Sequence, residues 1–489
     1  MSLLEIKNLT FRYDNQIEEL FNNISFQIDT NWKLGLIGCN GKGKTTLLEL
    51  LQNKYSYQGY ITPGFVFDYF PYHIKDPNQI TISIINQIGD FERWEIEREL
   101  SLLEVNEDVL ERPFSTLSNG EQTKVMLAAL FLKNHDLLLI DEPTNHLDLS
   151  GRIALSNYLK RKRSFILVSH DRNFIDNCVD HILAINRNDV EIIKGNFTTW
   201  YQQKNDQDNL ELKQNEKLTK EIKRLKEASK QNSLWSDKVE KSKNTRISGL
   251  KPDKGYIGHK AAKMMQRSKN VARRQQRAVE EKKQLLKNIE VIESLKINCL
   301  AYPKKQLCSL NDVSLYYGNR QILEHISFTI NQGDRINLSG QNGSGKTSII
   351  KLLLAENDNY QGNIKIASNL KISYLPQQDG LSGSLSKYID ENQLDPSLFK
   401  TILRKMDFSR ELFNQDLSTY SKGQKKKVML AKCLSTPAHL YIMDEPLNYL
   451  DIFTRIQIQE MLLKYQPTIL FVEHDQYFCS QIKTKEVKL

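Results

Sequence analysis

The sequence reads Gly38-Cys39-Asn40-Gly41-Lys42-Gly43-Lys44-Thr45 near its start and Gly340-Gln341-Asn342-Gly343-Ser344-Gly345-Lys346-Thr347 in its second half. Both stretches have the spacing G-x-x-x-x-G-K-T and follow a short apolar run, as a phosphate-binding loop does. Glycines at these positions let backbone N–H groups face a phosphate. The lysine then reaches the outer phosphate oxygens and the threonine hydroxyl ligates Mg²⁺. We therefore expect two ATP sites, with these ligands: Gly38, Asn40, Gly41, Gly43, Lys44, Thr45, Thr46, Gly340, Asn342, Gly343, Gly345, Lys346, Thr347 and Ser348.

Three further motifs recur at almost the same distance along the chain. Ser118-Asn-Gly120 returns as Ser421-Lys-Gly423, and Asp141-Glu142-Pro143 returns as Asp444-Glu445-Pro446, each 303 residues later. His170-Asp171 returns as His474-Asp475 after 304 residues, and the glycine loop itself after 302. Four motifs in one order at a nearly constant offset indicate a tandem duplication.

Each copy alternates short apolar runs with helical patterns, which is typical of an α/β domain built around a largely parallel sheet. Ligand sites in such folds lie at the carboxyl ends of the strands, where these motifs fall. We expect domains at 1–203 and 304–489, joined by a segment at 204–303. Apolar residues in that segment recur at spacings of three and four, which predicts two amphipathic helices zipped as a hairpin. They are Leu218, Ile222, Leu225, Leu285, Ile289 and Ile292.

The acidic pairs that end the second strand of each copy predict the catalytic centre. Asp141 and Asp444 are expected to hold Mg²⁺ together with the loop threonines Thr45 and Thr347. Glu142 and Glu445 are then placed to orient and polarise the attacking water, so the chain is expected to hydrolyse ATP to ADP and phosphate.

The sequence around Ser118 and Gly120 resembles the signature motif of ATP-binding-cassette (ABC) proteins, and Tyr420-Ser-Lys-Gly423 is its second copy. A serine and glycine that open a helix offer N–H groups and a dipole to a phosphate. In that family the phosphate belongs to ATP on the opposite cassette. The resemblance also implies an adenine-stacking tyrosine, a switch histidine, and a glutamine that serves Mg²⁺ and water. The matching residues are Tyr13, Tyr317, His170, His474 and Gln377.

Two departures from the family pattern fall on one composite site. Tyr72 stands where the first copy should have the glutamine, and Tyr420 replaces the usual leucine of the second signature. Both belong to the site of Lys44 and Glu142 with Ser421 and Gly423. We expect this site to hydrolyse ATP more slowly than the site of Lys346, Gln377 and Glu445 with Ser118 and Gly120.

The composition is 39% hydrophobic and 26% charged, without an apolar run long enough to span a bilayer or a signal peptide at the start. The six cysteines are scattered, which is typical of a reducing cytoplasm. Most of the basic excess is concentrated, because residues 238–287 hold 16 Lys/Arg against 4 Asp/Glu while the whole chain carries +9. Such asymmetry indicates a polyanionic partner for that segment.

The whole chain resembles the ABC-F proteins, in which a helical hairpin joins two cassettes. Its stretch DKGYIGHKAAKMMQRSK, 253–269, resembles the linker of members that confer resistance to lincosamides, streptogramins A and pleuromutilins. The resemblance implies a cytoplasmic monomer whose cassettes pair with each other, enter the ribosomal exit site and displace P-site tRNA and drug. Partners would be large-subunit rRNA and P-site tRNA, with no membrane permease and no DNA. Candidate RNA contacts are Tyr256, Ile257, His259, Lys260, Lys263, Arg267 and Lys269.

Two other functions stay open from the sequence. A housekeeping ABC-F factor that rescues stalled ribosomes would share these features. A dual-cassette transport ATPase, or a binder of DNA structures, would share the ATP sites but would not normally carry so basic an interdomain arm.

Overall fold

The computed structural model describes residues 2–14, 19–145, 147–186, 190–241, 293–317, 320–341, 343–356, 359–377 and 380–489, and five single residues of the linker. The chain forms two compact units, Met1–Trp200 together with Ile292–Leu489, and Tyr201–Val291. Both sequence repeats therefore belong to one unit and the segment between them forms the other. The domain limits 1–203, 204–303 and 304–489 stay predictions.

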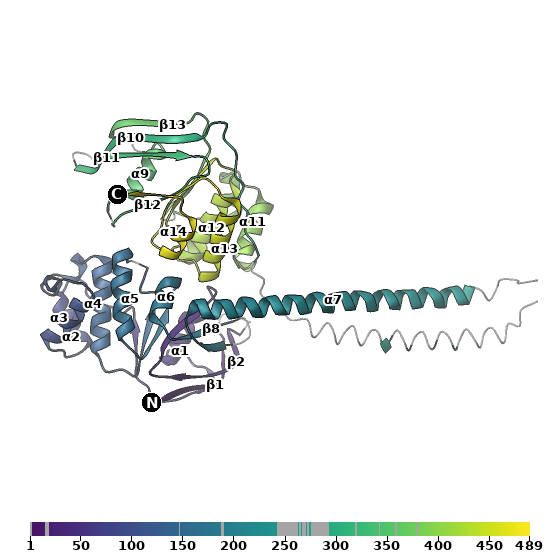
Figure 1. Cartoon of the computed structure of the whole chain (residues 1–489). Helices are drawn as coiled ribbons and strands as arrows, with labels where there is room; N and C mark the ends of the chain where they lie inside the picture. Colours follow the sequence, from purple (N-terminus) through teal and green to yellow (C-terminus); the bar gives the residue numbers. More distant parts are fainter. Residues whose placement is uncertain are drawn as a thin grey trace, which may run out of the picture. The chain divides into compact units, whose positions relative to one another are not determined.

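The first cassette is built around a six-stranded sheet with the strand order β5-β6-β7-β3-β8-β9. Strand β8 of this sheet is labelled in Figure 1. Neighbouring strands are parallel except for β8 and β9. Strand β7 and all but the last residue of β6 are buried, as expected of parallel strands covered on both faces. The strands are β3 (Lys33–Gly38), β5 (Phe67–Phe70), β6 (Leu137–Asp141), β7 (Phe165–Val168), β8 (His181–Ile185) and β9 (Val190–Lys194).

A separate antiparallel sheet completes the first cassette, and the sequence analysis did not predict it. Strands β2 (Phe21–Asp29), β1 (Leu3–Phe11) and β4 (Gln58–Ile61) lie in that order. In β2, Ile24, Phe26 and Ile28 are buried and the residues between them are exposed, the alternation of a strand with one solvated face. The expectation of a parallel sheet therefore describes the catalytic sheet and leaves this second sheet out.

Three helices of the first cassette begin at a capping side chain. Ser118 accepts a hydrogen bond from the backbone N–H of Glu121, Asp148 from that of Gly151, and Asp171 from that of Phe174. These caps place the signature serine at the exposed start of α4. The helices are α1 (Lys44–Leu51), α2 (Thr81–Ile88), α3 (Arg93–Leu102), α4 (Asn119–Leu132), α5 (Leu149–Arg161) and α6 (Arg172–Cys178), with 3-10 turns at Glu107–Glu111 and Phe114–Thr116.

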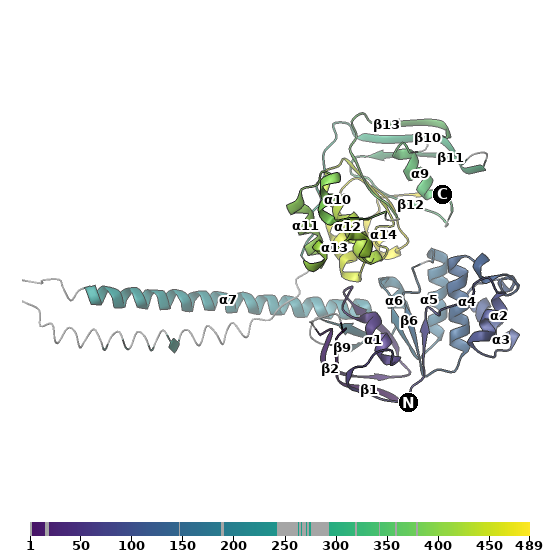
Figure 2. The ribbon, with the colours of Figure 1, turned by 180° about the vertical axis from the view of Figure 1, so that it is seen from behind.

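The second cassette repeats this plan. Its parallel sheet has the order β14-β15-β16-β12-β17 and its antiparallel sheet the order β11-β10-β13. Figure 2 shows α10, α11, α12 and α13 gathered together, and their apolar side chains share one core. The elements are β10 (Gln306–Tyr317), β11 (Arg320–Asn331), β12 (Arg335–Ser339), α9 (Lys346–Leu353), β13 (Tyr360–Ile366), β14 (Ile372–Leu375), α10 (Leu385–Glu391), α11 (Pro396–Lys405), α12 (Lys422–Ser435), β15 (Leu440–Asp444), α13 (Ile452–Tyr465), β16 (Ile469–Val472), α14 (Gln476–Ile482) and β17 (Lys485–Lys488), with 3-10 turns at Glu411–Asn414 and Leu417–Thr419.

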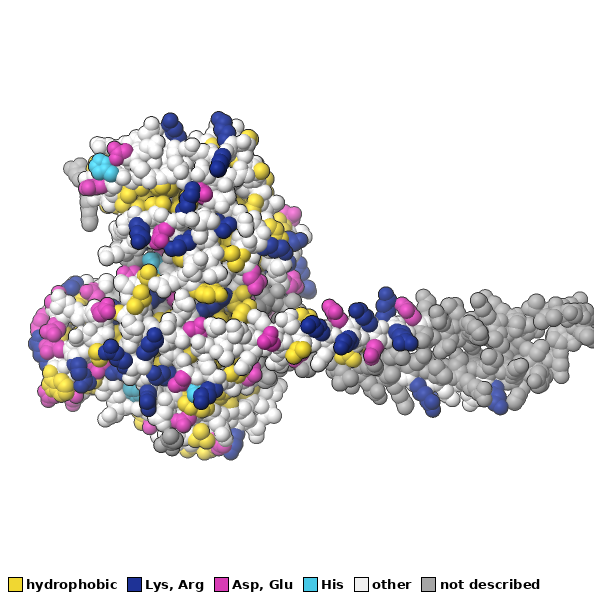
Figure 3. Space-filling view, in the orientation of Figure 1, with side chains coloured by type: hydrophobic (Ala, Val, Ile, Leu, Met, Phe, Trp, Pro, Cys, Tyr) yellow, Lys and Arg dark blue, Asp and Glu magenta, His cyan; other side chains and the backbone are white. Residues whose placement is uncertain are grey.

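The linker unit is described mainly through α7 (Phe197–Lys241), a helix of 45 residues. Of the predicted apolar stripe, Ile222 is buried and Leu218 half-buried. Lysine, arginine and acidic side chains alternate on the visible part of α7 (Figure 3), and residues 197–241 hold 10 Lys/Arg against 8 Asp/Glu. The basic excess therefore follows in residues 242–291, with 14 Lys/Arg against 4 Asp/Glu.

The second half of the linker is described at Lys263, Gln266, Asn270, Arg273 and Arg274, which are helical and exposed. The other candidate RNA contacts, Tyr256, Ile257, His259, Lys260, Arg267 and Lys269, lie outside the described residues, as do Leu285, Ile289 and Ile292. None of the described helices has the length and hydropathy that a bilayer-spanning segment needs.

Candidate active sites

The first glycine loop curls around its own lysine. Gly43 has φ +90°, and an added Cβ there would lie 2.7 Å from the ring of Phe21. Lys44 is 8% exposed and its Nζ donates to the carbonyls of Gly38, at 2.8 Å, and Cys39, at 3.2 Å. Burial lowers the pKa of Lys44, against the attraction of nearby carboxylates. The lysine is thus held inside the loop that a phosphate would enter.

A hydroxyl and a carboxylate meet beside this loop. The Thr45 hydroxyl donates to Oδ2 of Asp141 at 2.9 Å, and the Tyr69 hydroxyl donates to the same oxygen at 3.1 Å. Burial raises the pKa of Asp141. Mg²⁺ prefers hard oxygen ligands and is often bound by a carboxylate together with substrate phosphates. The pair Thr45 and Asp141 fits that ion without a larger protein cage, and no group of three His, Cys, Asp or Glu that could hold a metal ion by itself is found in the described ranges.

The first catalytic glutamate is enclosed. Glu142 has φ +50°, and its Oε1 lies 3.2 Å from Nε2 of His170. Burial and then the neighbouring charge of Asp141 raise the pKa of Glu142 to about 8. Burial lowers the pKa of His170 well below its usual value, and the charges of Lys44 and Arg455 lower it further.

The second site has the same plan with different neighbours. Lys346 donates to the carbonyls of Gly340 and Gln341, both at 2.8 Å, and Thr347 donates to Asp444 at 3.2 Å.

The second catalytic glutamate is held by two amides. Glu445 accepts hydrogen bonds on Oε2 from Nε2 of Gln377, at 2.8 Å, and from Nδ2 of Asn448. His474 is more distant from it, with Nε2 3.9 Å from Oε1 of Glu445. Glu445 therefore has amide donors that Glu142 lacks among its recorded bonds.

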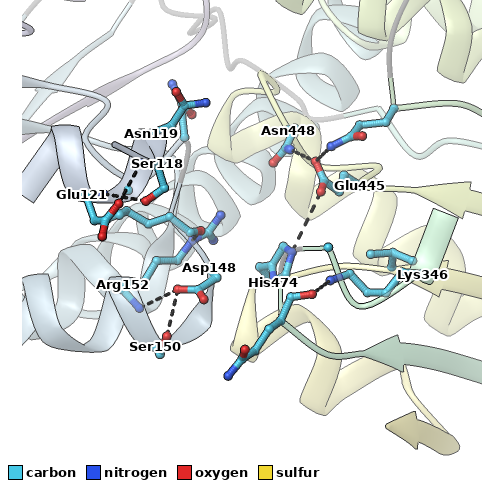
Figure 4. A pocket seen from close by; sticks show the side chains of 18 of the residues that line it. Ser118, Asn119, Glu121, Asp148, Ser150, Arg152, Lys346, Glu445, Asn448 and His474 are labelled. Carbon is cyan, nitrogen blue, oxygen red and sulfur yellow. Dashed lines mark hydrogen bonds and ion pairs between the residues drawn. The ribbon is translucent and has the colours of Figure 1, made fainter. Parts of the chain in front are cut away.

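The second site is completed by the first cassette. A cavity of about 1060 Å³ is lined by Ser118 and Gly120 from one side and by Lys346, Thr347 and Glu445 from the other. Figure 4 shows Ser118 facing this cavity opposite Glu445 and His474. Residues of the two cassettes, more than 200 positions apart, thus border one volume, which is the arrangement needed to close two cassettes on a nucleotide.

The first site is completed by the second cassette through a tighter contact. A cavity of about 420 Å³ is lined by Tyr13, Lys44, Thr45 and Glu142 among other first-cassette residues. The side-chain amide of Asn40 donates to the carbonyl of Tyr449 at 3.2 Å. A Cβ on Gly423 would lie 3.2 Å from that amide nitrogen, so the second signature motif adjoins the first glycine loop.

Neither of the two departures is among the residues that line the first-site cavity. Tyr420 is 4% exposed, packs against Phe408 and donates its hydroxyl to the carbonyl of Leu412. Tyr420 therefore belongs to the packing around α12 and does not line the first-site cavity, so it is no evidence for a slow site. Tyr72 is 39% exposed and supplies no amide to Glu142.

The remaining predicted ligands are distributed as follows. The Tyr13 hydroxyl shares a 2.7 Å hydrogen bond with that of Thr46, and the Tyr13 ring packs edge-on against Phe11. Gly343 and Ser348 line the cavity of the second site. Ser421 caps α12 through the N–H of Gln424. Asn342 lies outside the described residues, and so does the side chain of Tyr317.

Four residues near the two sites were not predicted from the sequence. Asp148 and Arg152 line the second-site cavity. Of their repeats, the charge of Asp451 raises the pKa of Lys44 and the charge of Arg455 lowers the pKa of Glu142, both at the first site. Although burial opposes it, the charge of Lys427 holds the pKa of Asp451 well below its usual range. A signal was available, because both pairs recur at the same 303-residue offset as the motifs.

Comparison with known proteins agrees with this geometry. The family model described as ABC transporter matches residues 21–145 and 323–448, just over half of the chain. The ATP-binding protein Uup of Buchnera aphidicola is 28% identical, over 99% of this chain and 80% of its own. The ribosome protection protein VmlR of Bacillus subtilis is 28% identical, over 99% and 86%. The probable ATP-binding protein YheS of Escherichia coli K12 is 28% identical, over 94% and 75%.

Solved structures share the fold. The archaeal ribosome recycling factor aABCE1, solved with the stalk protein aP1, superposes with a TM-score of 0.63 at 19% identity, covering 98% of this chain and 87% of that one. A structure titled RNase-L Inhibitor gives a TM-score of 0.61 at 19% identity, over 99% and 87%. The chain belongs to the ABC family and is an ATPase with two composite sites. Its similarity to Uup, VmlR and YheS extends over nearly the whole chain.

Proposed function

We propose that this ATPase is a cytoplasmic ribosome factor that protects ribosomes from antibiotics. In the ATP-bound form its paired cassettes enter the exit site. Its linker then displaces P-site tRNA and drug near the peptidyl-transferase centre. The observation that carries the proposal is the charge of residues 242–291, 14 Lys/Arg against 4 Asp/Glu, placed between two ATP-dependent cassettes. A segment of that charge suits a phosphate-lined RNA cleft.

The ATP sites supply the switch in this proposal. Mg²⁺, when bound, neutralises phosphate charge and orients the outer phosphate. Thr45 with Asp141, and Thr347 with Asp444, are placed to hold it. Ser118 and Ser421 are the N-caps of α4 and α12. A phosphate bound by the opposite cassette is attracted to these helix N-termini, and this attraction favours closure of the two cassettes.

Hydrolysis reopens the pair. Glu445, oriented by Gln377, accepts a proton from the attacking water at the second site. Loss of the outer phosphate removes the partner of the signature serine. Binding to the ribosome is therefore expected in the ATP state, with release after hydrolysis.

Contacts of the linker with RNA follow from its charge. Arg273 and Arg274 are exposed neighbours on the described part of its second half, and Lys263 is exposed as well. Such side chains contact phosphate and fix position without reading sequence. VmlR, 28% identical over 99% of this chain, bears the name ribosome protection protein, and this supports the choice of partner.

A housekeeping role on the ribosome is the second candidate. Uup and YheS are as similar to this chain as VmlR is, at 28% identity, and their names state only ATP binding. Growth with and without the gene, in the presence of a lincosamide, a streptogramin A or a pleuromutilin, separates the two roles. Unchanged inhibitory concentrations for all three drugs would favour the housekeeping role.

The first experiment is ribosome sedimentation with the Glu142→Gln/Glu445→Gln double variant at several salt concentrations. We expect co-sedimentation with ATP, weaker binding with ADP, and a steep loss as salt rises. The unmodified protein with ADP is the matched control. No binding under any of these conditions would refute a ribosomal partner.

A further inference from the structure

The second cassette contains a buried lysine and a buried glutamate where the first has hydroxyl groups. Lys426 on α12 is 2% exposed and Glu473, just after β16, is 6% exposed. At the equivalent positions, 303 and 304 residues earlier, the first cassette has Thr123 and Ser169. Burying an ion costs free energy unless its partners compensate. We therefore ask what Lys426 and Glu473 do that Thr123 and Ser169 do not.

The lysine joins two loops that carry the second site. Its Nζ donates to the carbonyl of Pro376 at 3.1 Å and to the carbonyl of Asp444 at 3.2 Å. Pro376 precedes Gln377, and Asp444 precedes Glu445. Lys426 therefore holds together the backbones of the two residues whose side chains form the 2.8 Å amide–carboxylate bond.

Glu473 joins two further segments of the second site. Its Oε1 accepts from the N–H of His474 at 2.9 Å, and its Oε2 accepts from the N–H of Leu447 at 3.2 Å. The charge of Glu473 is also the strongest carboxylate influence on Lys426, where it opposes the effect of burial. The pair thus ties the glutamine loop, the end of β15, the following turn and the switch histidine.

The first cassette keeps one of these ties, and its hydroxyls make shorter-range contacts. The Thr123 hydroxyl donates within its own helix, to the carbonyl of Asn119 at 2.9 Å. The Ser169 hydroxyl is 3.3 Å from that of Thr144, the counterpart of Leu447. The Thr123 side chain is too short to bridge the two separate loops that Lys426 bridges, so the tie between the glutamine loop and the end of β15 belongs to the second cassette.

We propose that Lys426 and Glu473 are a positioning pair for ATP hydrolysis at the second composite site. They hold Gln377 and Glu445 in the geometry that orients water. Neither residue lines the second-site cavity, so the pair is expected to affect turnover and not nucleotide binding. The proposal concerns the ATPase activity and is independent of the ribosomal partner.

The test transplants the first cassette's residues into the second. The variant Lys426→Thr/Leu447→Thr/Glu473→Ser has a set of residues that already folds in the first cassette. We expect kcat for ATP to fall roughly tenfold, as for supporting residues around a site, while KM stays within about twofold and the Tm is kept. The conservative variant Lys426→Arg should keep most of the turnover. Thr123→Ala, which removes only a bond within α4, is the control and should leave kcat unchanged.

Two results would overturn the proposal. One is an unchanged kcat in the triple variant, which would make the charged pair a neutral replacement of the hydroxyls. The other is a triple variant in which kcat falls together with a lower Tm and a changed KM, which would mean that the pair contributes to general stability.

Discussion

The side-chain amide of Gln377 donates a 2.8 Å hydrogen bond to the carboxylate of Glu445. The first cassette has Tyr72 in place of that amide, and Glu142 is instead enclosed beside His170 at 3.2 Å. An amide that points at a carboxylate fixes its direction and can share the attacking water, whereas Glu142 faces an imidazole. We therefore predict that the two ATP sites are unequal.

The Glu→Gln variants of the two sites should lower total ATP turnover by different amounts. Glu445→Gln is expected to lower total ATP turnover by about 100-fold, because it removes the base of the better-equipped site. Glu142→Gln should lower it only a few-fold. Steady-state phosphate release measures both. Equal losses in the two single variants would refute the inequality of the sites.

Exchange of the residues at the glutamine position tests the amide itself. Gln377→Tyr should lower kcat roughly tenfold with little change in KM for ATP, since the amide orients a catalytic group. The matched change Tyr72→Gln should leave kcat unchanged or raise it. A Gln377→Tyr variant with full activity would show that the hydrogen bond to Glu445 has no part in turnover.

The contact between Gly423 and Asn40 should not tolerate a side chain. A Cβ on Gly423 would lie 2.7 Å from the carbonyl of Tyr449, so Gly423→Ala forces the backbone apart at a cost of about 1 to 3 kcal/mol. We expect a higher KM for ATP and weaker ATP-dependent closure. Gly380→Ala, where a Cβ meets nothing within 4 Å, is the control. Identical kinetics for both variants would contradict the closeness of this contact.

A pair of buried carboxylates at the cassette interface predicts a pH effect on stability. Burial, and then the charge of Asp171, raise the pKa of Asp475 to about 6. The folded protein therefore favours the protonated form. The stability that this form contributes is fully present below the unfolded pKa near 4 and is lost as pH rises through 6.

Asp475→Asn removes the ionisation that lowers the stability of the folded protein, and it keeps a side chain that can cap α14. At pH 7.5 the variant should be more stable by about 1 kcal/mol, with a Tm higher by about 2 °C. The difference should shrink at pH 5. Thermal unfolding at the two pH values measures it, and a variant that is less stable at pH 7.5 would contradict the prediction.

Charge reversal in the linker tests the RNA contact. Arg273→Glu/Arg274→Glu changes two exposed residues and should weaken ribosome co-sedimentation and flatten its salt dependence, while basal ATPase activity is kept. Lys75→Glu/Lys365→Glu makes the same change at two exposed sites on the cassettes. Equal loss in both pairs would mean that net charge, and not the linker, governs binding.

The sequence by itself determined the duplicated α/β plan and the ATPase chemistry. The glycine loops, the acidic pairs and the histidines are local patterns whose spacing already implies what they bind, and their repetition removed the ambiguity of one motif. The linker's charge could be counted in the same way. The pairing of each signature with the opposite loop was implied by family resemblance and not by spacing.

Only the tertiary structure decided which of these residues meet and which are buried. Tyr420 stands beside a signature motif in sequence, yet its ring lies in the core, because burial depends on the packing around α12. Lys426 looks like a solvated helix residue, yet it bridges loops 50 and 18 residues away. Long-range contacts of this kind depend on how helices and sheets stack, and a local pattern of residues does not contain that information.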